Sequence, residues 1–147
     1  MVAVGQGCFP IYIGRAGQAG LSLNPRLILP GDFSMAGGER SVNSLPFLAA
    51  DDRPTAIFAA NDETALGVMS GLRRLGWHVP KDVSVCGFGD LPVAQAGGPT
   101  LTTVHIGLRE LGRTGALKVL ALLKNEAVET TEIAPTYVIE RDSTAPI

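Results

Sequence analysis

The chain has 147 residues, a formal net charge of −2, 46% apolar residues and 18% charged residues. This composition is typical of a single globular domain and excludes an intrinsically disordered chain. The twelve basic residues are scattered along the sequence, whereas a nucleic-acid-binding surface clusters them to neutralise phosphates. We therefore do not predict that this chain binds DNA by itself.

The cysteines and histidines predict no metal site and no cofactor. Cys8 and Cys86 match no metal or redox spacing, and His78 and His105 belong to no ligand pattern. Two distant cysteines do not make a disulfide framework, which favours a reducing, cytoplasmic environment. The first residues contain neither a basic segment nor a long apolar run, so we predict no signal peptide and no transmembrane helix.

The first third of the chain predicts short, weak elements. Residues 1–10 are rich in glycine and small apolar residues, typical of a strand remnant or a disordered lead. A helix weakened by glycines is predicted over 11–19, and a short strand over 26–29. A weak helix follows over about 37–49, and Pro54 marks its limit because residues before proline avoid helical angles.

The centre of the chain predicts a strand followed by an amphipathic helix. The run 55–60 is apolar without alternation, as expected for a parallel strand covered on both faces. The helix begins near Glu63, and Gly76 provides a residue that ends it. Its apolar face is predicted from residues recurring every three positions, Leu66, Met69, Leu72 and Leu75, with Ala65 and Val68 widening the stripe.

The remaining segments continue the alternation of strands and helices. Strands are predicted over 83–88, 102–106 and 132–140, with a short helix or loop over 92–98 and the longest helix over 107–124. A β-α alternation with short loops predicts a three-layer, doubly wound α/β fold with a parallel sheet.

Polar residues follow two of these strands, and ligands of such sheets bind beyond the carboxyl ends of the strands. Asp62 and Asp90 could each cap a following helix or line a cleft. Asn61 is different, because with Asp62 as the cap its amide would be free to donate to and accept from a polar ligand. Phe33 and Phe88 could pack on a sugar ring or a base at the same edge, or could anchor loops in the core.

Three stretches in order carry a family resemblance: "PTAIFAANDETALGVMSGLRRLGWHVPKDVSVCGFGDLP", "LTTVHIGLRELGRTGALKVLALL" and "PTYVIERDSTAP". They resemble the effector-binding domain of the lactose-repressor (LacI/GalR) family of bacterial transcription regulators. The resemblance runs from about Gly20 to Pro146 and is dense from Pro54 to Thr114. It implies a periplasmic-binding-protein-like type I fold, in which two α/β subdomains enclose an effector cleft, with a helix-turn-helix module upstream.

The resemblance also implies a division of the chain. Residues 1–10 do not resemble the family and form a lead segment. Residues 11–106 correspond to the C-terminal effector-binding subdomain. Residues 107–125 correspond to a helix of the N-terminal subdomain, and residues 126–147 to the return strand and tail.

The resemblance implies four ligand-binding residues: Asn61, Phe33, Phe88 and Asp90. Asn61 matches an effector-contacting asparagine, Phe33 a bulky cleft residue in "GDF", and Phe88 the aromatic residue of a G-(F/Y)-D-D element. Gly89 replaces the first Asp of that element, and Asp90 keeps the second. An effector-binding Arg of the family has no counterpart at Cys8 or Phe9.

The helix predicted over 107–124 is apolar on most of its surface and requires cover. We predict that it folds back on its own sheet or packs against another copy of the chain, because exposed leucines would form an unusually large apolar patch. The helix 63–75, with the segment 91–99, is a second predicted contact face. There the resemblance implies a dimer interface, with Val68 and Arg74 as the candidate interface residues.

The leading hypothesis is a truncated sensing and dimerisation domain that binds a sugar or small metabolite in an intact regulator and reaches DNA only through the N-terminal module. A solute-binding protein of a transport system is the alternative, because it shares the fold. An enzyme is not predicted, since Ser70 lies within a helix and not in a nucleophile elbow, and no acid, base and nucleophile converge.

Overall fold

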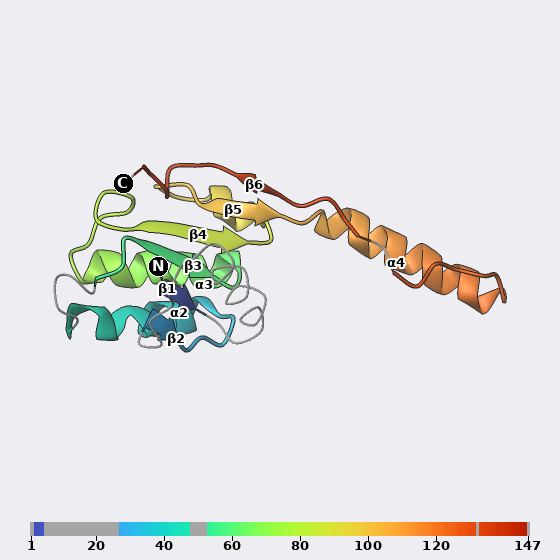
Figure 1. Ribbon diagram of the computed structural model, residues 1–147, viewed down its shortest axis with the longest axis horizontal. Helices are drawn as coiled ribbons and strands as arrows, with labels where there is room; N and C mark the ends of the chain where they lie inside the picture. Colours follow the sequence, from blue (N-terminus) through green and yellow to red (C-terminus); the bar gives the residue numbers. More distant parts are fainter. Residues whose placement is uncertain (1, 5–26, 48–52, 132, 147) are drawn as a thin grey trace, which may run out of the picture.

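A six-stranded mixed sheet forms the centre of the computed structural model, which describes residues 2–4, 27–47, 53–131 and 133–146 (Figure 1). The strand order is β2-β1-β3-β4-β5-β6. The first five strands are parallel, and β6 is antiparallel to β5. This confirms the predicted α/β class with a largely parallel sheet. The strands are β1 (Val2–Val4), β2 (Ile28–Leu29), β3 (Ala56–Ala59), β4 (Ser84–Phe88), β5 (Thr102–His105) and β6 (Tyr137–Ile139).

The helices are α2 (Met35–Ser41), α3 (Asp62–Arg74) and α4 (Leu108–Leu123), with 3-10 segments η2 (Val42–Phe47) and η4 (Pro92–Gln95). The predicted helix over 37–49 begins earlier, because the Ser34 side chain caps α2 by accepting from the Gly37 N–H at 2.9 Å. It tightens into η2 after Ser41. The helix predicted over 11–19 lies outside the described residues.

The buried face of helix α3 overlaps the predicted one but is shifted from the three-residue repeat toward Ala65 and Val68. Its fully covered apolar residues are Ala65, Val68 and Leu72, whereas Leu66 and Met69 are only partly buried. A strict three-residue repeat drifts around a helix of 3.6 residues per turn, and the buried face follows steps of three and four. The prediction of Val68 as an interface residue is therefore wrong, because Val68 lies in the core.

Helices α2 and α3 run side by side (Figure 1) and touch through glycines. A Cβ built on Gly67 would lie 1.9 Å from the Met35 carbonyl oxygen, and one on Gly38 would lie 2.2 Å from the Thr64 carbonyl oxygen. Arg74 pairs with Glu39 of α2. These contacts hold the two helices beside each other along their length, and both helices start at the carboxyl ends of β2 and β3.

The C-terminal segment is tied into the sheet by Ser143, which is completely buried. Its hydroxyl donates to the Val85 carbonyl at 2.6 Å and accepts from the Thr102 N–H at 2.8 Å. Its backbone carbonyl accepts from the Val85 N–H at 2.8 Å. The predicted strand over 132–140 is short, but the residues after it hold the amino ends of β4 and β5 together.

Helix α4 extends away from the sheet, and the return segment runs back beside it to β6 (Figure 1). None of its sixteen residues is buried. The prediction that this helix folds back on its own sheet is therefore wrong. Gly107, with φ +59°, redirects the chain between β5 and α4 and starts the helix outside the body of the fold.

Candidate functional site at the strand ends

Asn61 caps α3, and its side-chain amide both accepts and donates a hydrogen bond. Its Oδ1 accepts from the Thr64 N–H at 2.8 Å, and its Nδ2 donates to the Phe33 carbonyl at 2.9 Å. The prediction that Asp62 caps this helix is wrong by one residue. The second Nδ2 hydrogen and the second Oδ1 lone pair are the remaining hydrogen-bonding capacity of Asn61.

Phe33 lies beside Asn61 with its side chain 42% exposed. Its backbone adopts φ +62°, a left-handed conformation that is costly for a bulky residue. The bond from the Asn61 amide to the Phe33 carbonyl supports that conformation. The structure therefore brings together two of the predicted site residues, at the carboxyl ends of β2 and β3.

Asp62 is fully buried and joins α3 to the ends of two strands. Its Oδ2 accepts from the Leu91 N–H at 2.6 Å, and its Oδ1 accepts from the Thr103 hydroxyl. A Cβ on Gly87 would lie 2.4 Å from Oδ1, so a glycine in β4 makes room for this carboxylate. Asp62 is a structural anchor beneath the strand ends.

Asp90 does not cap the segment that follows it, which corrects the second capping prediction. The cap position of η4 is Leu91, and no side chain bonds there. Asp90 instead accepts from Arg141 Nη2 at 2.7 Å through Oδ1 and pairs with His105 Nδ1 at 2.8 Å through Oδ2. It thereby ties the tip of β4 to β5 and to the segment after β6.

The electrostatics of this cluster favour a charged Asp90. Burial raises the pKa of Asp90, but the hydrogen bonds and charges of Arg141 and His105 outweigh it, and the net pKa lies below the ordinary value. Since an ionised Asp90 only accepts, a neutral His105 must carry its proton on Nδ1. The imidazole also stacks on Tyr137, with ring centroids 4.9 Å apart.

Phe88 is half-buried at the end of β4 and pairs with Val104 in register. Strand alternation places its side chain on the opposite face from that of Gly87, whose Cβ direction meets Asp62. Gly89 adopts φ +122°, a region that essentially only glycine occupies. The glycine at the position of the family's first Asp is therefore matched to its backbone.

The sequence did not identify Arg141, Tyr137 and Thr103 as residues of this cluster, and it gave no ligand pattern for His105. The polar residues of "ERDST" were a signal, since charged and hydroxyl side chains just after a strand invite pairing. Arg141 meets Asp90 from 51 positions away, and Thr103 meets Asp62 from 41 positions away, so only the folded topology identifies these pairs.

Cys86 is half-buried in β4 near Asp62, and burial followed by the Asp62 charge raises its pKa to about 11. We expect Cys86 in a Cys8→Ser variant to react with a disulfide reagent at pH 8 about 100-fold more slowly than in the denatured chain, because its thiolate is that much rarer. A native rate equal to the denatured rate would contradict the raised pKa of Cys86 in β4.

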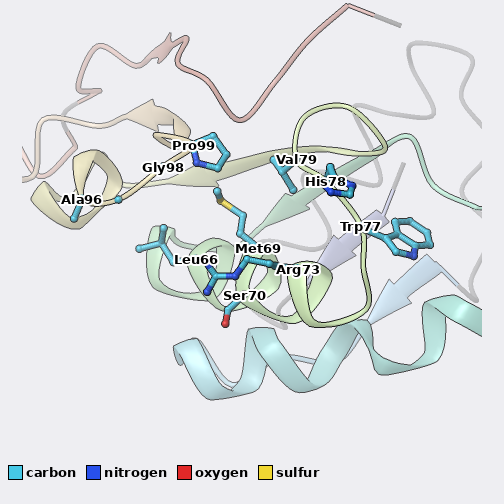
Figure 2. Close-up of a pocket in the computed structure, with 11 residues that line it drawn as sticks. Leu66, Met69, Ser70, Arg73, Trp77, His78, Val79, Ala96, Gly98 and Pro99 are labelled. Atoms are coloured by element: carbon cyan, nitrogen blue, oxygen red, sulfur yellow. The ribbon is translucent and has the colours of Figure 1, made fainter.

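A separate groove of about 300 Å³ lies along α3, away from the strand ends (Figure 2). Leu66, Met69 and Pro99 provide apolar surface, and Arg73 lies at its edge. Leu66 and Met69, predicted to face the sheet, thus contribute to a surface. Arg74, the other candidate interface residue, is paired with α2.

Two further observations concern metal binding and membrane insertion. Within the described ranges, no three His, Cys, Asp or Glu side chains gather in a way that could hold a metal ion. No helix among the same residues is long and apolar enough to cross a membrane.

Residues 9–144 match the model of the periplasmic binding protein-like domain. The PurR repressor of Aliivibrio fischeri is 36% identical over 109 residues, covering 74% of this chain and 32% of the repressor. PurR of Pasteurella multocida is 33% identical over 135 residues, covering 88% of this chain and 39% of the repressor. The chain thus spans about a third of the length of the curated relatives it matches.

Solved structures give the same relationship. The Escherichia coli repressor ascG superposes with a TM-score of 0.82 at 28% identity, over 98% of this chain and 55% of ascG. A regulator titled as the CelR–cellobiose complex superposes with a TM-score of 0.85 at 26% identity, over 97% of this chain and 46% of CelR. The chain therefore belongs to the periplasmic-binding-protein-like domain family of LacI-type transcriptional regulators and corresponds to part of that domain.

Proposed function

We propose that this chain forms one half of the effector cleft in a LacI-type transcriptional regulator that works in the cytoplasm. The main support for this proposal is the contact between Asn61 and Phe33 at the carboxyl ends of β2 and β3. It presents an aromatic face beside an amide with spare hydrogen-bonding capacity, a combination that suits a sugar or another small polar metabolite. Phe88 and the edge held by Asp90 extend the same half-cleft.

The relatives are repressors, which supports a regulator over a transport solute-binding protein. DNA contact belongs to a helix-turn-helix module outside this chain. The intact regulator would be a homodimer that uses the groove of Figure 2. Ligand binding would close two lobes and shift the arrangement of the two subunits. No catalytic step is part of this proposal.

A chimera tests the half-cleft, with this chain replacing the segment of CelR that it superposes on. A thermal-shift screen with sugars, including cellobiose, and nucleosides should give no shift for the 147-residue chain and a saturable shift for the chimera. A saturable shift for the chain alone would overturn the half-cleft. A folded chimera that binds no member of the panel would overturn the ligand-sensing function.

Asn61→Asp separates capping from recognition within that chimera. Aspartate still accepts from the Thr64 N–H but cannot donate to Phe33 or to a ligand. We expect the melting temperature to fall slightly, because the bond to the Phe33 carbonyl is lost while the cap remains, and ligand affinity to fall about tenfold. Asn43→Asp, the same exchange at an exposed residue of η2, is the matched control. Equal affinities for both variants would remove Asn61 from the site.

A further inference from the structure

Phe33 lies in the connection between β2 and α2, in a backbone conformation that its own side chain disfavours. Its φ of +62° falls in the left-handed region, which a bulky residue occupies only where neighbouring contacts hold it there. Asn61 supplies one such contact, because its Nδ2 donates to the Phe33 carbonyl at 2.9 Å. The second contact comes from Asp32, the residue before Phe33.

The Asp32 carboxylate reaches past Phe33 and bonds twice to Ser34. Its Oδ1 accepts from the Ser34 N–H at 3.1 Å and from the Ser34 hydroxyl at 2.6 Å. The Phe33 carbonyl and the Ser34 N–H belong to one peptide group. This group is therefore held at both of its polar atoms, by Asn61 on one side and by Asp32 on the other.

The surroundings of Asp32 leave room for its carboxylate and keep it ionised. A Cβ built on Gly37 would lie 1.9 Å from Asp32 Oδ1, so only a glycine at that position of α2 admits the carboxylate. Arg40 Nη2 donates to Asp32 Oδ2 at 3.1 Å. The hydrogen bonds from Ser34, ahead of the Arg40 charge, hold the pKa of Asp32 below its ordinary value. An exposed ion pair adds little to folding stability, so the main consequence of these contacts is the conformation of Phe33.

We propose that Asp32 is a positioning residue of the half-cleft, which acts on the ligand through Phe33 by holding its ring in the conformation that meets the ligand. This inference rests on the proposed function, because it requires Phe33 to contact a ligand. The apparent affinity of a ligand falls in proportion to the fraction of molecules in the binding conformation. If loss of the Asp32 contacts leaves Phe33 in this conformation about one tenth of the time, affinity falls about tenfold.

The first test uses the 147-residue chain without ligand and compares Asp32→Ala in the parent and in a Phe33→Gly background. Glycine adopts φ +62° without support, so Asp32 has no strained residue to hold in that background. We expect Asp32→Ala to lower the melting temperature of the parent by at least about 3 °C more than that of Phe33→Gly. The weakened Ser34 cap affects both backgrounds alike. Equal losses in the two backgrounds would overturn the role of Asp32.

The second test measures ligand affinity in the CelR chimera by isothermal titration calorimetry, with the sugar or nucleoside of the panel that gives the largest thermal shift. Asp32→Ala should weaken binding about tenfold. Asp32→Asn should restore it to within about twofold of the parent, because the amide oxygen still accepts from Ser34. Arg40→Gln is the matched control, since it removes only the ion pair, and should also bind within about twofold of the parent.

The two tests fail in different ways. An Asp32→Ala chimera that binds as the parent does, or an Asp32→Asn chimera as weak as Asp32→Ala, would overturn the positioning role and leave the proposed function intact. A folded parent chimera that binds no member of the panel would remove the ligand from Phe33 and overturn the proposed function together with this inference.

Discussion

Replacing Gly67 with alanine is expected to destabilise the fold by more than about 3 kcal/mol. The new Cβ would lie 1.9 Å from the Met35 carbonyl oxygen and 2.7 Å from its carbon. These are backbone atoms of α2 and cannot rotate away, so the two helices must separate. Overpacking of this kind costs typically 1–3 kcal/mol and sometimes more, and separation would also break the bond between Asn61 and Phe33.

Gly115→Ala is the matched control, because it makes the same exchange in the middle of α4, where nothing lies within 4 Å of the added Cβ. Alanine favours a helix over glycine by about 1 kcal/mol, so this variant should be neutral or slightly stabilised. Urea denaturation followed by circular dichroism compares the two. A Gly67→Ala protein as stable as the control would show that α2 and α3 do not touch as described.

The apolar strands and the existence of the central helix were predictable because their signals are local. The unbroken run at Ala56–Ala59 needed cover on both faces, and Gly76, with φ +80°, ends α3 as expected. These features depend on burial and backbone conformation within about fifteen residues. The parallel sheet followed from their alternation, without knowledge of any contact.

The contacts at the strand ends were less predictable, because several polar residues there can cap a helix or accept the same hydrogen bonds. Asn61 and Asp62 are equally good caps, and the choice depended on Thr103 and Leu91, whose hydroxyl and N–H needed an acceptor at the position of Asp62. One of the two partners of Asp90, Arg141, lies 51 positions away. A single sequence identifies residues that can pair, whereas the topology decides which of them meet.

Replacing Asp62 with alanine is expected to lower the free energy of unfolding by about 3–5 kcal/mol. This loss is expected although Asp62 is not one of the predicted ligand-binding residues. The carboxylate is fully buried and accepts from the Leu91 N–H and the Thr103 hydroxyl. Removing it leaves the buried Thr103 hydroxyl and the part-buried Leu91 N–H unpaired, each at a cost of about 1–3 kcal/mol, and a small cavity. The Leu91 end should loosen most, because a backbone N–H cannot turn to another partner.

Asp62→Asn separates the geometry of this anchor from its charge. The amide oxygen can still accept from Leu91, while the new NH2 faces Thr103, whose hydroxyl can rotate and become the acceptor. Asp62→Asn should therefore lower the free energy of unfolding by only about 1 kcal/mol. Thr103→Val removes that adaptable hydroxyl, so combining it with Asp62→Asn should cost more than the two single changes together. Equal losses for Asp62→Asn and Asp62→Ala in urea denaturation would mean that the negative charge, and not the pair of accepted bonds, holds the strand ends to α3.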